Sequence, residues 1–245
     1  MEKDMTLKRT VRSIAVRTYN FVKPLLSEDN QFNTDSSLVY SYSQNAEDLL
    51  IDAILGCKPA GTYVDIGAND PVAFSNTKRF YDRGWSGICI EPNPEKYNKL
   101  IQQRERDVVI NCGISETEGY FPFYVLDQDM ISTFDLDIAN NMKLERCAKI
   151  VETLDIPIQR LDSLLDKYLN DKSIDFISID VEGNELAVLK SNNWKKFNPS
   201  AIVIEMCNNS NEICSYLAER QYIPVLQTTE NTIFIKKIWF NEKNQ

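Results

Sequence analysis

The sequence feature that most constrains the fold is a short apolar run followed by a turn of small residues, Thr62-Tyr-Val-Asp-Ile-Gly-Ala-Asn-Asp-Pro71. Its aromatic and β-branched residues favour a buried strand, and apolar residues at helical spacing follow at positions 74–81. A strand, a tight turn and a helix in this order open a doubly wound α/β domain. Gly67 leaves the turn bare, so we expect a ligand to lie against main-chain N–H groups beside a helix N-terminus.

This turn is a poor match to a dinucleotide site. A pyrophosphate normally lies against G-x-G-x-x-G, whose later glycines allow close approach, whereas positions 67–72 read Gly-Ala-Asn-Asp-Pro-Val. The carboxylate of Asp65 at the strand end would also repel a pyrophosphate. S-adenosylmethionine carries a sulfonium and an ammonium group, which suit a carboxylate, so we expect this cofactor here. The alternative without function is an ordinary strand–helix turn with a solvated Asp65.

The whole chain has the composition of a soluble globular protein. It has 245 residues, of which 43% are hydrophobic and 26% charged, enough for one α/β domain with an extension. We divide it into an N-terminal amphipathic helix with a polar linker (1–38) and a catalytic-type domain (39–245). We favour packing of that helix on its own domain or on a second subunit, as in a homo-oligomer, over contact with a membrane surface.

Charge and residue usage exclude several function classes. A net charge of −9 makes a nucleic-acid partner improbable on electrostatic grounds. The six cysteines lack metal-type spacing, and we interpret them as reduced, which predicts a cytoplasmic location. The chain contains no histidine, so a Ser-His-Asp or Cys-His mechanism cannot be built, and acid–base chemistry must come mainly from carboxylates.

Two further strands are expected to complete the cofactor site. The run Gly87–Pro92 ends at Glu91, and an acid at the end of the second strand of a doubly wound sheet accepts hydrogen bonds from a ribose. A third strand is expected over Val108–Ile114, where Asn111 and Gly113 lie at the position of an adenine ring. Residues 119–160 break the alternation and are interpreted as an insertion that, with residues 205–211, lines the acceptor pocket. A β-hairpin is expected to close the chain near residues 222–236.

Three acids follow the fourth and fifth expected strands. Asp180 and Glu182 end the run Ile174–Gly183 and share a strand parity, and Glu205 lies near the end of the run Ala201–Cys207. Our hypothesis is that Asp180 is the general base or orients the acceptor, with Glu205 as second candidate. The alternative is that Asp180 and Glu182 only cap the next helix. The three acids could also hold Mg²⁺, which takes carboxylates without histidine, although we do not favour a metal.

At this point the chain resembles the FkbM-type S-adenosylmethionine-dependent methyltransferases, over about residues 40–237. The V-D-I-G-A-N turn is shared by many methyltransferases, and its combination with the upstream Y-S-Q-N and with I-D-V-E-G-N-E is more specific. The matching segments, in the family's order, are Tyr42–Leu50, Val64–Pro71, Ser75–Thr77, Gly84–Gly87, Ile90–Asn93, Leu161–Leu164 and Ile179–Glu185.

The resemblance implies a class I methyltransferase (Rossmann-like) fold, with a seven-stranded, mostly parallel sheet and a C-terminal antiparallel hairpin. It also implies O-methylation of a small-molecule or sugar hydroxyl, with polysaccharide biosynthesis as a common setting. Its cofactor positions map onto Asp65, Gly67, Asn69 and Glu91, and its D-V-E-G acids onto Asp180 and Glu182. With the residues derived above, the expected cofactor-binding set is Asp65, Gly67, Ala68, Asn69, Asp70, Glu91, Asn111 and Gly113, and the expected catalytic set is Asp180, Glu182 and Glu205.

Three rival functions remain at this point. A nicotinamide-dependent oxidoreductase is opposed by the missing second glycine of the turn. A non-catalytic, methyltransferase-like scaffold or binding protein is opposed by the presence of Asp65, Gly67, Glu91 and Asp180. A nucleic-acid methyltransferase is opposed by the acidic composition and by Cys-Asn-Asn at positions 207–209 in place of an N-P-P-Y-like motif.

Overall fold

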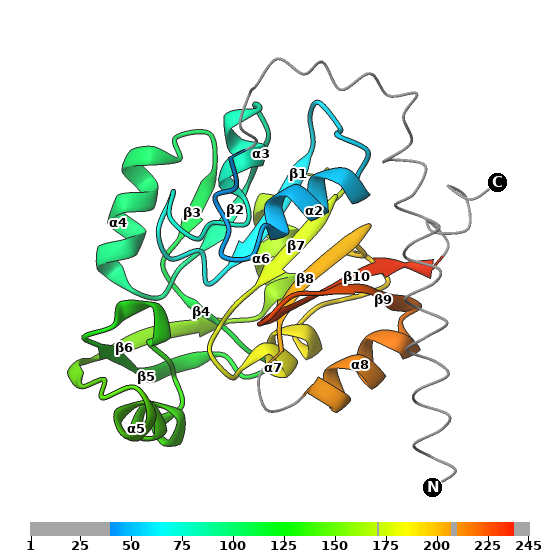
Figure 1. Ribbon diagram of the computed structural model, residues 1–245. Coiled ribbons are helices and arrows are strands. Elements are labelled where there is room, and N and C mark those ends of the chain that lie inside the picture. The colour runs from blue at the N-terminus through cyan, green and yellow to red at the C-terminus, as the bar shows by residue number, and fades with distance from the viewer. Residues whose placement is uncertain (1–39, 171, 207–209, 238–245) are drawn as a thin grey trace, which may run out of the picture.

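The computed structural model describes residues 40–170, 172–206 and 210–237. The helix and linker expected over residues 1–38 lie outside this part of the chain, and so does Cys207. Within it, a seven-stranded sheet carries helices on both faces, and a smaller three-stranded sheet lies beside it (Figure 1).

The main sheet has the strand order β3-β2-β1-β7-β8-β10-β9. Its strands are β1 (Thr62–Ile66), β2 (Ser86–Ile90), β3 (Val108–Ile110), β7 (Phe176–Ile179), β8 (Ala201–Glu205), β9 (Tyr222–Gln227) and β10 (Asn231–Lys236). All neighbours from β3 to β8 pair in parallel, whereas β10 is antiparallel to both β8 and β9. The expected mostly parallel sheet with a C-terminal antiparallel hairpin is confirmed.

Alternate residues of the strands build two separate cores, because side chains along a strand point to opposite faces. One core packs against α6 (Leu161–Tyr168), α7 (Glu185–Lys190) and α8 (Ser210–Glu219). The other packs against α2 (Glu47–Ile54), α3 (Lys78–Asp82) and α4 (Pro94–Gln103). Nearly continuous apolar runs in β1 and β7 follow from this burial on both faces. None of the described helices is long and apolar enough to cross a bilayer.

The third expected strand divides into two. β3 ends at Ile110, and β4 (Gly113–Ile114) leaves the main sheet to pair with β6 (Ile150–Gln159), which pairs on its other side with β5 (Gly119–Leu126). A short 3-10 helix (Asp129–Ile131) and α5 (Leu136–Glu145) complete this unit around a small core of their own. The expected insertion at residues 119–160 is therefore confirmed as a distinct unit beside the main sheet (Figure 1).

The helix after the first strand begins later than expected. α3 starts at Lys78, and the expectation of helix at positions 74–77 was wrong. Side chains in this segment bond to the backbone and compete with a helix. The Asp70 carboxylate accepts hydrogen bonds from the N–H groups of Val72 and Ala73. Phe74 takes up a left-handed conformation with φ of +56°. We call residues 70–77 the rim loop.

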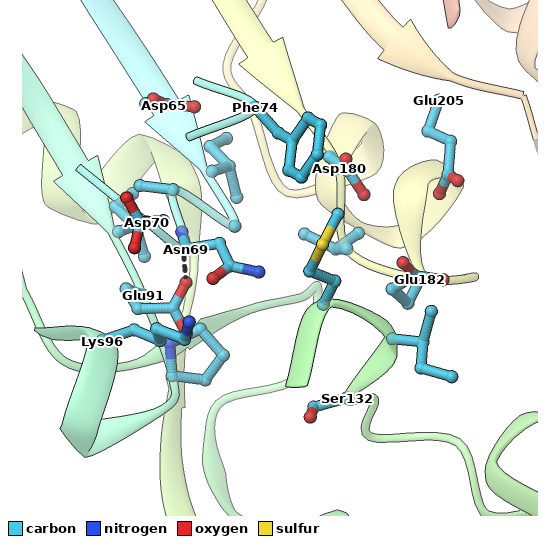
Figure 2. Close-up of a pocket in the computed structure, with 18 of the residues that line it drawn as sticks. Asp65, Asn69, Asp70, Phe74, Glu91, Lys96, Ser132, Asp180, Glu182 and Glu205 are labelled. Carbon is cyan, nitrogen blue, oxygen red and sulfur yellow. Dashed lines mark hydrogen bonds between the residues drawn. The ribbon is translucent and has the colours of Figure 1, made fainter. Parts of the chain in front are cut away.

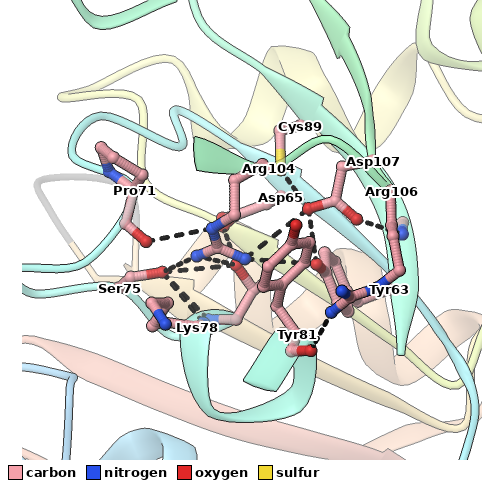
Figure 3. A network of polar contacts seen from close by, with 12 residues as sticks. Tyr63, Asp65, Pro71, Ser75, Lys78, Tyr81, Cys89, Arg104, Arg106 and Asp107 are labelled. Carbon is pink, nitrogen blue, oxygen red and sulfur yellow. Dashed lines mark hydrogen bonds and ion pairs between the residues drawn. The ribbon is translucent and has the colours of Figure 1, made fainter. Parts of the chain in front are cut away.

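A buried guanidinium anchors the rim loop to the sheet (Figure 3). Arg104 is 1% exposed. Its Nε donates to the carbonyl oxygen of Pro71 at 3.0 Å, and Nη2 donates to Ser75 Oγ at 2.9 Å. Its charge is balanced by the Asp107 carboxylate at 3.6 Å, which also accepts a hydrogen bond from the Tyr63 hydroxyl. One side chain thus connects the end of α4, the core of β1 and the rim loop.

Replacing Arg104 by Met should lower the free energy of unfolding by about 3–5 kcal/mol, because the Asp107 carboxylate is left buried without its counter-charge. Urea denaturation measures this loss. The control is Lys99→Met on the same helix, where an exposed pair with Glu95 is lost and the expected cost is below about 0.5 kcal/mol. Equal costs for the two substitutions would contradict the assignment of Arg104 as an anchor.

Candidate active site

A cavity of about 580 Å³ opens at the carboxyl ends of the parallel strands. It lies where the strand order reverses between β1 and β7, the position at which doubly wound sheets bind ligands. Figure 2 shows two groups of side chains facing this space. The first group, from the β1 and β2 ends, includes Asn69 and Glu91. The second, from the β7 and β8 ends, comprises Asp180, Glu182 and Glu205.

Gly67 has to be glycine because two strands approach each other closely at this point. Its φ is +80°, and a Cβ atom there would lie 1.7 Å from the carbonyl oxygen of Asp180. The expectation that the turn offers free N–H groups was wrong. The N–H groups of Gly67 and Ala68 both donate to the carbonyl oxygen of Ile90. A ligand therefore meets side chains and carbonyl oxygens of this turn more than its N–H groups.

Asn69 presents a polar atom that no described residue satisfies. It has a φ of +45°, a conformation that asparagine tolerates better than most residues. Its N–H donates to Glu91 Oε2 at 2.7 Å. Its Oδ1 is buried without a hydrogen-bond partner among the described residues, and its amide points into the pocket (Figure 2). A buried polar atom of this kind is a natural acceptor for a donor group of a bound cofactor.

Glu91 is the acid expected at the end of the second strand, and it faces the pocket. Its two oxygens accept hydrogen bonds from the N–H groups of Asn69 and Asn93, both at 2.7 Å. Burial outweighs these bonds and raises the pKa of Glu91 to about 7. Lys96, itself buried, lines the pocket beside it and acts in the opposite direction on that pKa (Figure 2). Carboxylate oxygens accept two hydrogen bonds each, so capacity for a ribose diol remains.

Asp65 contributes to the pocket wall and to the anchor of the rim loop. Its carboxylate is 5% exposed and accepts a 2.6 Å hydrogen bond from the Thr77 hydroxyl. Burial raises the pKa of Asp65 above its ordinary value. Asp65 is thus a lining acid whose carboxylate also holds Thr77 of the rim loop.

The third-strand residues divide between two roles. Gly113 lines the pocket together with its neighbour Cys112. Asn111 is absent from the lining residues that the structure describes, and its amide donates to the carbonyl oxygens of Glu91 and Pro92, both at 2.8 Å. The structure therefore places Asn111 as a clamp on the backbone that carries Glu91. Contact of Asn111 and Gly113 with an adenine ring stays a prediction.

Asp180, Glu182 and Glu205 converge as the sequence pattern suggested, but by a different local structure. β7 ends at Ile179, so no strand extends to Glu182, and Glu182 instead turns back with a φ of +53°. One carboxylate oxygen of each acid lies within 4.8 Å of the others. Neither Asp180 nor Glu182 caps the following helix, whose N-cap Asn184 has no side-chain capping bond. The capping alternative is thereby removed.

Mutual repulsion within this cluster changes its acidity. Burial, followed by the charges of Glu205 and Glu182, raises the pKa of Asp180 well above its ordinary value. Burial and Glu205 raise the pKa of Glu182 to about 8. Protonation, or a cation bound between the carboxylates, relieves this repulsion. Their oxygens suit Mg²⁺, and the cationic groups of a cofactor or acceptor would serve equally.

Sequence reasoning missed several pocket residues. Gln44, Phe74, Arg146 and Glu230 also line the cavity. Gln44 belongs to the upstream Y-S-Q-N segment, which entered the sequence analysis only as part of the family resemblance. Phe74 was assigned to a helix and so was not considered. Arg146 and Glu230 are far from the other lining residues in the sequence, and only the tertiary structure brings them to the pocket.

Comparison with known proteins decides the family. The model of the methyltransferase FkbM domain matches residues 65–224, which is more than half of the chain. The chain belongs to this family. The protein is accordingly an S-adenosylmethionine-dependent methyltransferase, and the strand order of its main sheet is that of class I members. No curated protein is significantly similar to it in sequence.

Three solved structures illustrate the distant likeness of this FkbM-domain protein to other methyltransferases. A precorrin-6Y C5,15-methyltransferase from Geobacter metallireducens is 10% identical, with 77% of this chain and 88% of that chain covered and a TM-score of 0.43. A TehB-like enzyme from Corynebacterium glutamicum is 12% identical, with 91% and 100% covered and a TM-score of 0.40. A 1,6-didemethyltoxoflavin-N1-methyltransferase from Burkholderia thailandensis is 11% identical, with 91% and 87% covered and a TM-score of 0.38.

Gly67→Ala should abolish cofactor binding, because its new methyl group collides with the backbone of Asp180. Gly84→Ala is the matched control: its φ is also positive, at +103°, but nothing lies within 4 Å of the added Cβ, so only a strain cost of about 1–2 kcal/mol is expected. Thermal unfolding with and without S-adenosylhomocysteine measures both effects. Ligand-induced stabilisation that survives in Gly67→Ala would contradict the packing argument.

Cofactor affinity should fall on acidification through pH 7. The pKa of Glu91 is about 7, so the carboxylate is ionised above this pH and accepts hydroxyl hydrogen bonds better than its protonated form does below it. Affinity for S-adenosylhomocysteine should rise about tenfold between about pH 6 and pH 8 if only ionised Glu91 binds. Calorimetry measures the profile. Glu91→Gln should bind more weakly and show a flat profile, and an unchanged slope in this variant would contradict the assignment.

Proposed function

We propose that the protein transfers the methyl group to a hydroxyl oxygen of a small molecule or sugar. The observation that carries this proposal is the position of Asp180 in the pocket, beside the turn that carries Gly67, in a chain without histidine. A hydroxyl must lose its proton on methylation. Burial raises the pKa of Asp180, which makes it a stronger proton acceptor than an ordinary carboxylate.

The donor residues fit S-adenosylmethionine on three observations. Asn69 offers an unsatisfied oxygen, Glu91 offers a carboxylate with free acceptor capacity, and Gly67 lets the turn pass close against the backbone of Asp180. When bound, the cofactor supplies an electrophilic methyl group on a sulfonium. Asn69 and Glu91 would hold its polar groups, and residues of the insertion would shield the reacting atoms from water. Alignment of the acceptor is the largest contribution, up to about 7–11 kcal/mol in well-oriented systems.

Asp180 would orient the acceptor hydroxyl and take its proton. Positive charge brought into the pocket lowers the pKa of Asp180, because it offsets the repulsion from Glu205 and Glu182. The two glutamates then raise the pKa of Asp180 and accept hydrogen bonds from other hydroxyl groups of the acceptor. Seven acids and two basic residues line the cavity, which opposes nucleic acid as an acceptor. The seven acids are Asp65, Asp70, Glu91, Asp180, Glu182, Glu205 and Glu230.

A divalent metal is the second way to balance the carboxylate cluster. The oxygens of Asp180, Glu182 and Glu205 are close enough to share an Mg²⁺ ion. We propose that protons and the cationic cofactor fulfil this role, since the pKa of Glu182, at about 8, already permits protonation at neutral pH. A chelator should leave the methyl-transfer rate unchanged, and a loss of rate restored by added Mg²⁺ would favour the metal.

Asp180→Asn should lower turnover by about 10²–10⁴-fold, the usual contribution of a general base, and leave the affinity for S-adenosylhomocysteine within a few-fold of the original. Transfer of radiolabelled methyl groups to sugar hydroxyls measures the first effect and calorimetry the second. The matched control, Asp166→Asn, changes an exposed carboxylate paired with Lys196 and should alter neither. Turnover that persists in Asp180→Asn would refute its role as base.

The alternative function is a methyltransferase-like binding protein or scaffold without turnover. It predicts that the protein binds S-adenosylmethionine and consumes none of it in the presence of any acceptor. The proposed setting in polysaccharide biosynthesis rests on family resemblance. Formation of a homo-oligomer through the N-terminal segment stays a prediction, since that segment lies outside the described residues.

A further inference from the structure

Phe74 is an aromatic side chain that the cofactor chemistry leaves unexplained. It is 56% exposed, yet it lines the pocket. It also has a φ of +56°, which is unusual for a bulky residue and carries a conformational cost. In Figure 2 its ring and the carboxylate of Asp180 point into the same open space. A second exposed apolar side chain, that of Met130, belongs to the same lining.

The rim loop holds this ring in a defined place. Arg104 binds the loop on both sides of Phe74, through the carbonyl oxygen of Pro71 and the hydroxyl of Ser75. Immediately after it, the Asn76 amide donates to Ser178 Oγ on β7 at 3.1 Å, and Thr77 bonds to Asp65. The exposed ring therefore stands on an anchored backbone, which lowers the entropy cost of using it as a binding surface.

The groups around the ring define the chemistry of its partner. Asp180, Glu182, Glu205 and Glu230 line this part of the pocket and can only accept hydrogen bonds when ionised. Arg146, from the insertion, is the basic lining residue whose charge acts on this cluster, where it lowers the pKa of Glu182. An apolar ring face next to several acceptors matches a ring that has C–H groups on one face and hydroxyl groups at its edge. The surplus of carboxylates repels an anion.

We infer that Phe74 is the platform on which the acceptor ring stacks, and that the acceptor is an uncharged or amine-bearing carbohydrate whose hydroxyl is presented to Asp180. This inference rests on the proposed function and goes beyond it in two respects. It assigns acceptor specificity to one residue of the rim loop. It also excludes sugars linked to a nucleoside diphosphate, so that methylation acts on a free sugar or on one already transferred from its activated donor by a glycosyl-transfer reaction.

The test has a binding arm that does not depend on turnover. Phe74→Trp, loaded with S-adenosylhomocysteine, is titrated with methyl glycosides of neutral hexoses, with methyl glycosides of 2-amino-2-deoxyhexoses and with a uridine-diphosphate hexose. Stacking should produce a saturable change in tryptophan emission with glycosides and none with the nucleotide sugar. Val72→Trp is the control, because Val72 lies in the same loop outside the pocket lining. No change in Phe74→Trp, or an equal change in both variants, would overturn the inference.

A kinetic arm uses methyl transfer to the same glycosides. Phe74→Ala should raise the KM for the acceptor at least tenfold and leave the affinity for S-adenosylhomocysteine unchanged. Phe74→Tyr should bring the KM back close to that of the original protein. Val72→Ala should match the original protein. An unchanged KM in Phe74→Ala would overturn the inference while the proposed function stands. Lost affinity for S-adenosylhomocysteine would also overturn it, because the ring would then contact the cofactor.

The two proposals can fail separately. A saturable emission change in Phe74→Trp without any methyl transfer by the original protein would support the platform and refute hydroxyl methylation of these sugars. Methyl transfer to the nucleotide sugar, with the free glycosides unreactive, would support the reaction and overturn the inferred acceptor class.

Discussion

The structure depends on a close approach between the ends of two neighbouring strands, β1 and β7. The N–H of Asp180 donates to the carbonyl oxygen of Ile66 at 3.0 Å, and the carbonyl oxygen of Asp180 faces Gly67 where any side chain would collide. This contact places the cofactor turn directly beside the candidate base. The distance between the turn and the candidate base is thus set by main-chain hydrogen bonding in the middle of the sheet.

Charge balance is the second constraint on the site. Carboxylates occupy nearly every strand end around the pocket, and burial together with mutual repulsion raises the pKa values of Glu91, Asp180 and Glu182. Such an arrangement is costly in the free protein and is relieved by positive charge. A cofactor with a sulfonium and an ammonium group therefore completes the electrostatics of the site as well as its chemistry, which explains why an acidic pocket suits this methyl donor.

The rim loop connects the core to the pocket. Arg104 is buried with Asp107 in the layer behind the pocket, and the same guanidinium bonds to the loop that carries Phe74. The cost of burying this charge is offset by several hydrogen bonds at once. An exposed aromatic ring in a strained backbone conformation is held because Arg104 bonds to the loop on either side of it.

Local patterns in the sequence were enough to predict most strands of the main sheet, its closing hairpin and the strand-end position of Asp65, Glu91, Asp180 and Glu205, and the family resemblance supplied the number and direction of the strands. These features depend on apolar runs and on the small-residue turn, whose physical causes act over a few residues. The same reasoning failed at the rim loop. Asp70 and Ser75 accept hydrogen bonds from nearby backbone N–H groups, and these bonds outweigh the helical spacing of apolar residues there. Arg104, which follows α4, reinforces that outcome through its bond to Ser75.

The sequence by itself determined the α/β fold class and the absence of any histidine-based mechanism, because strand-forming runs, turn glycines and residue inventory are local or compositional properties. Its motifs resembled the FkbM family, and the match over residues 65–224 shows that family. Only the tertiary structure decided that the turn N–H groups are already engaged, that Asn111 clamps the backbone of Glu91, and that Glu182 reaches the acid cluster by a left-handed turn. It also decided that Phe74, Arg146 and Glu230 share one pocket. Those facts depend on which distant groups compete for each hydrogen bond and each space, and no local pattern encodes that competition.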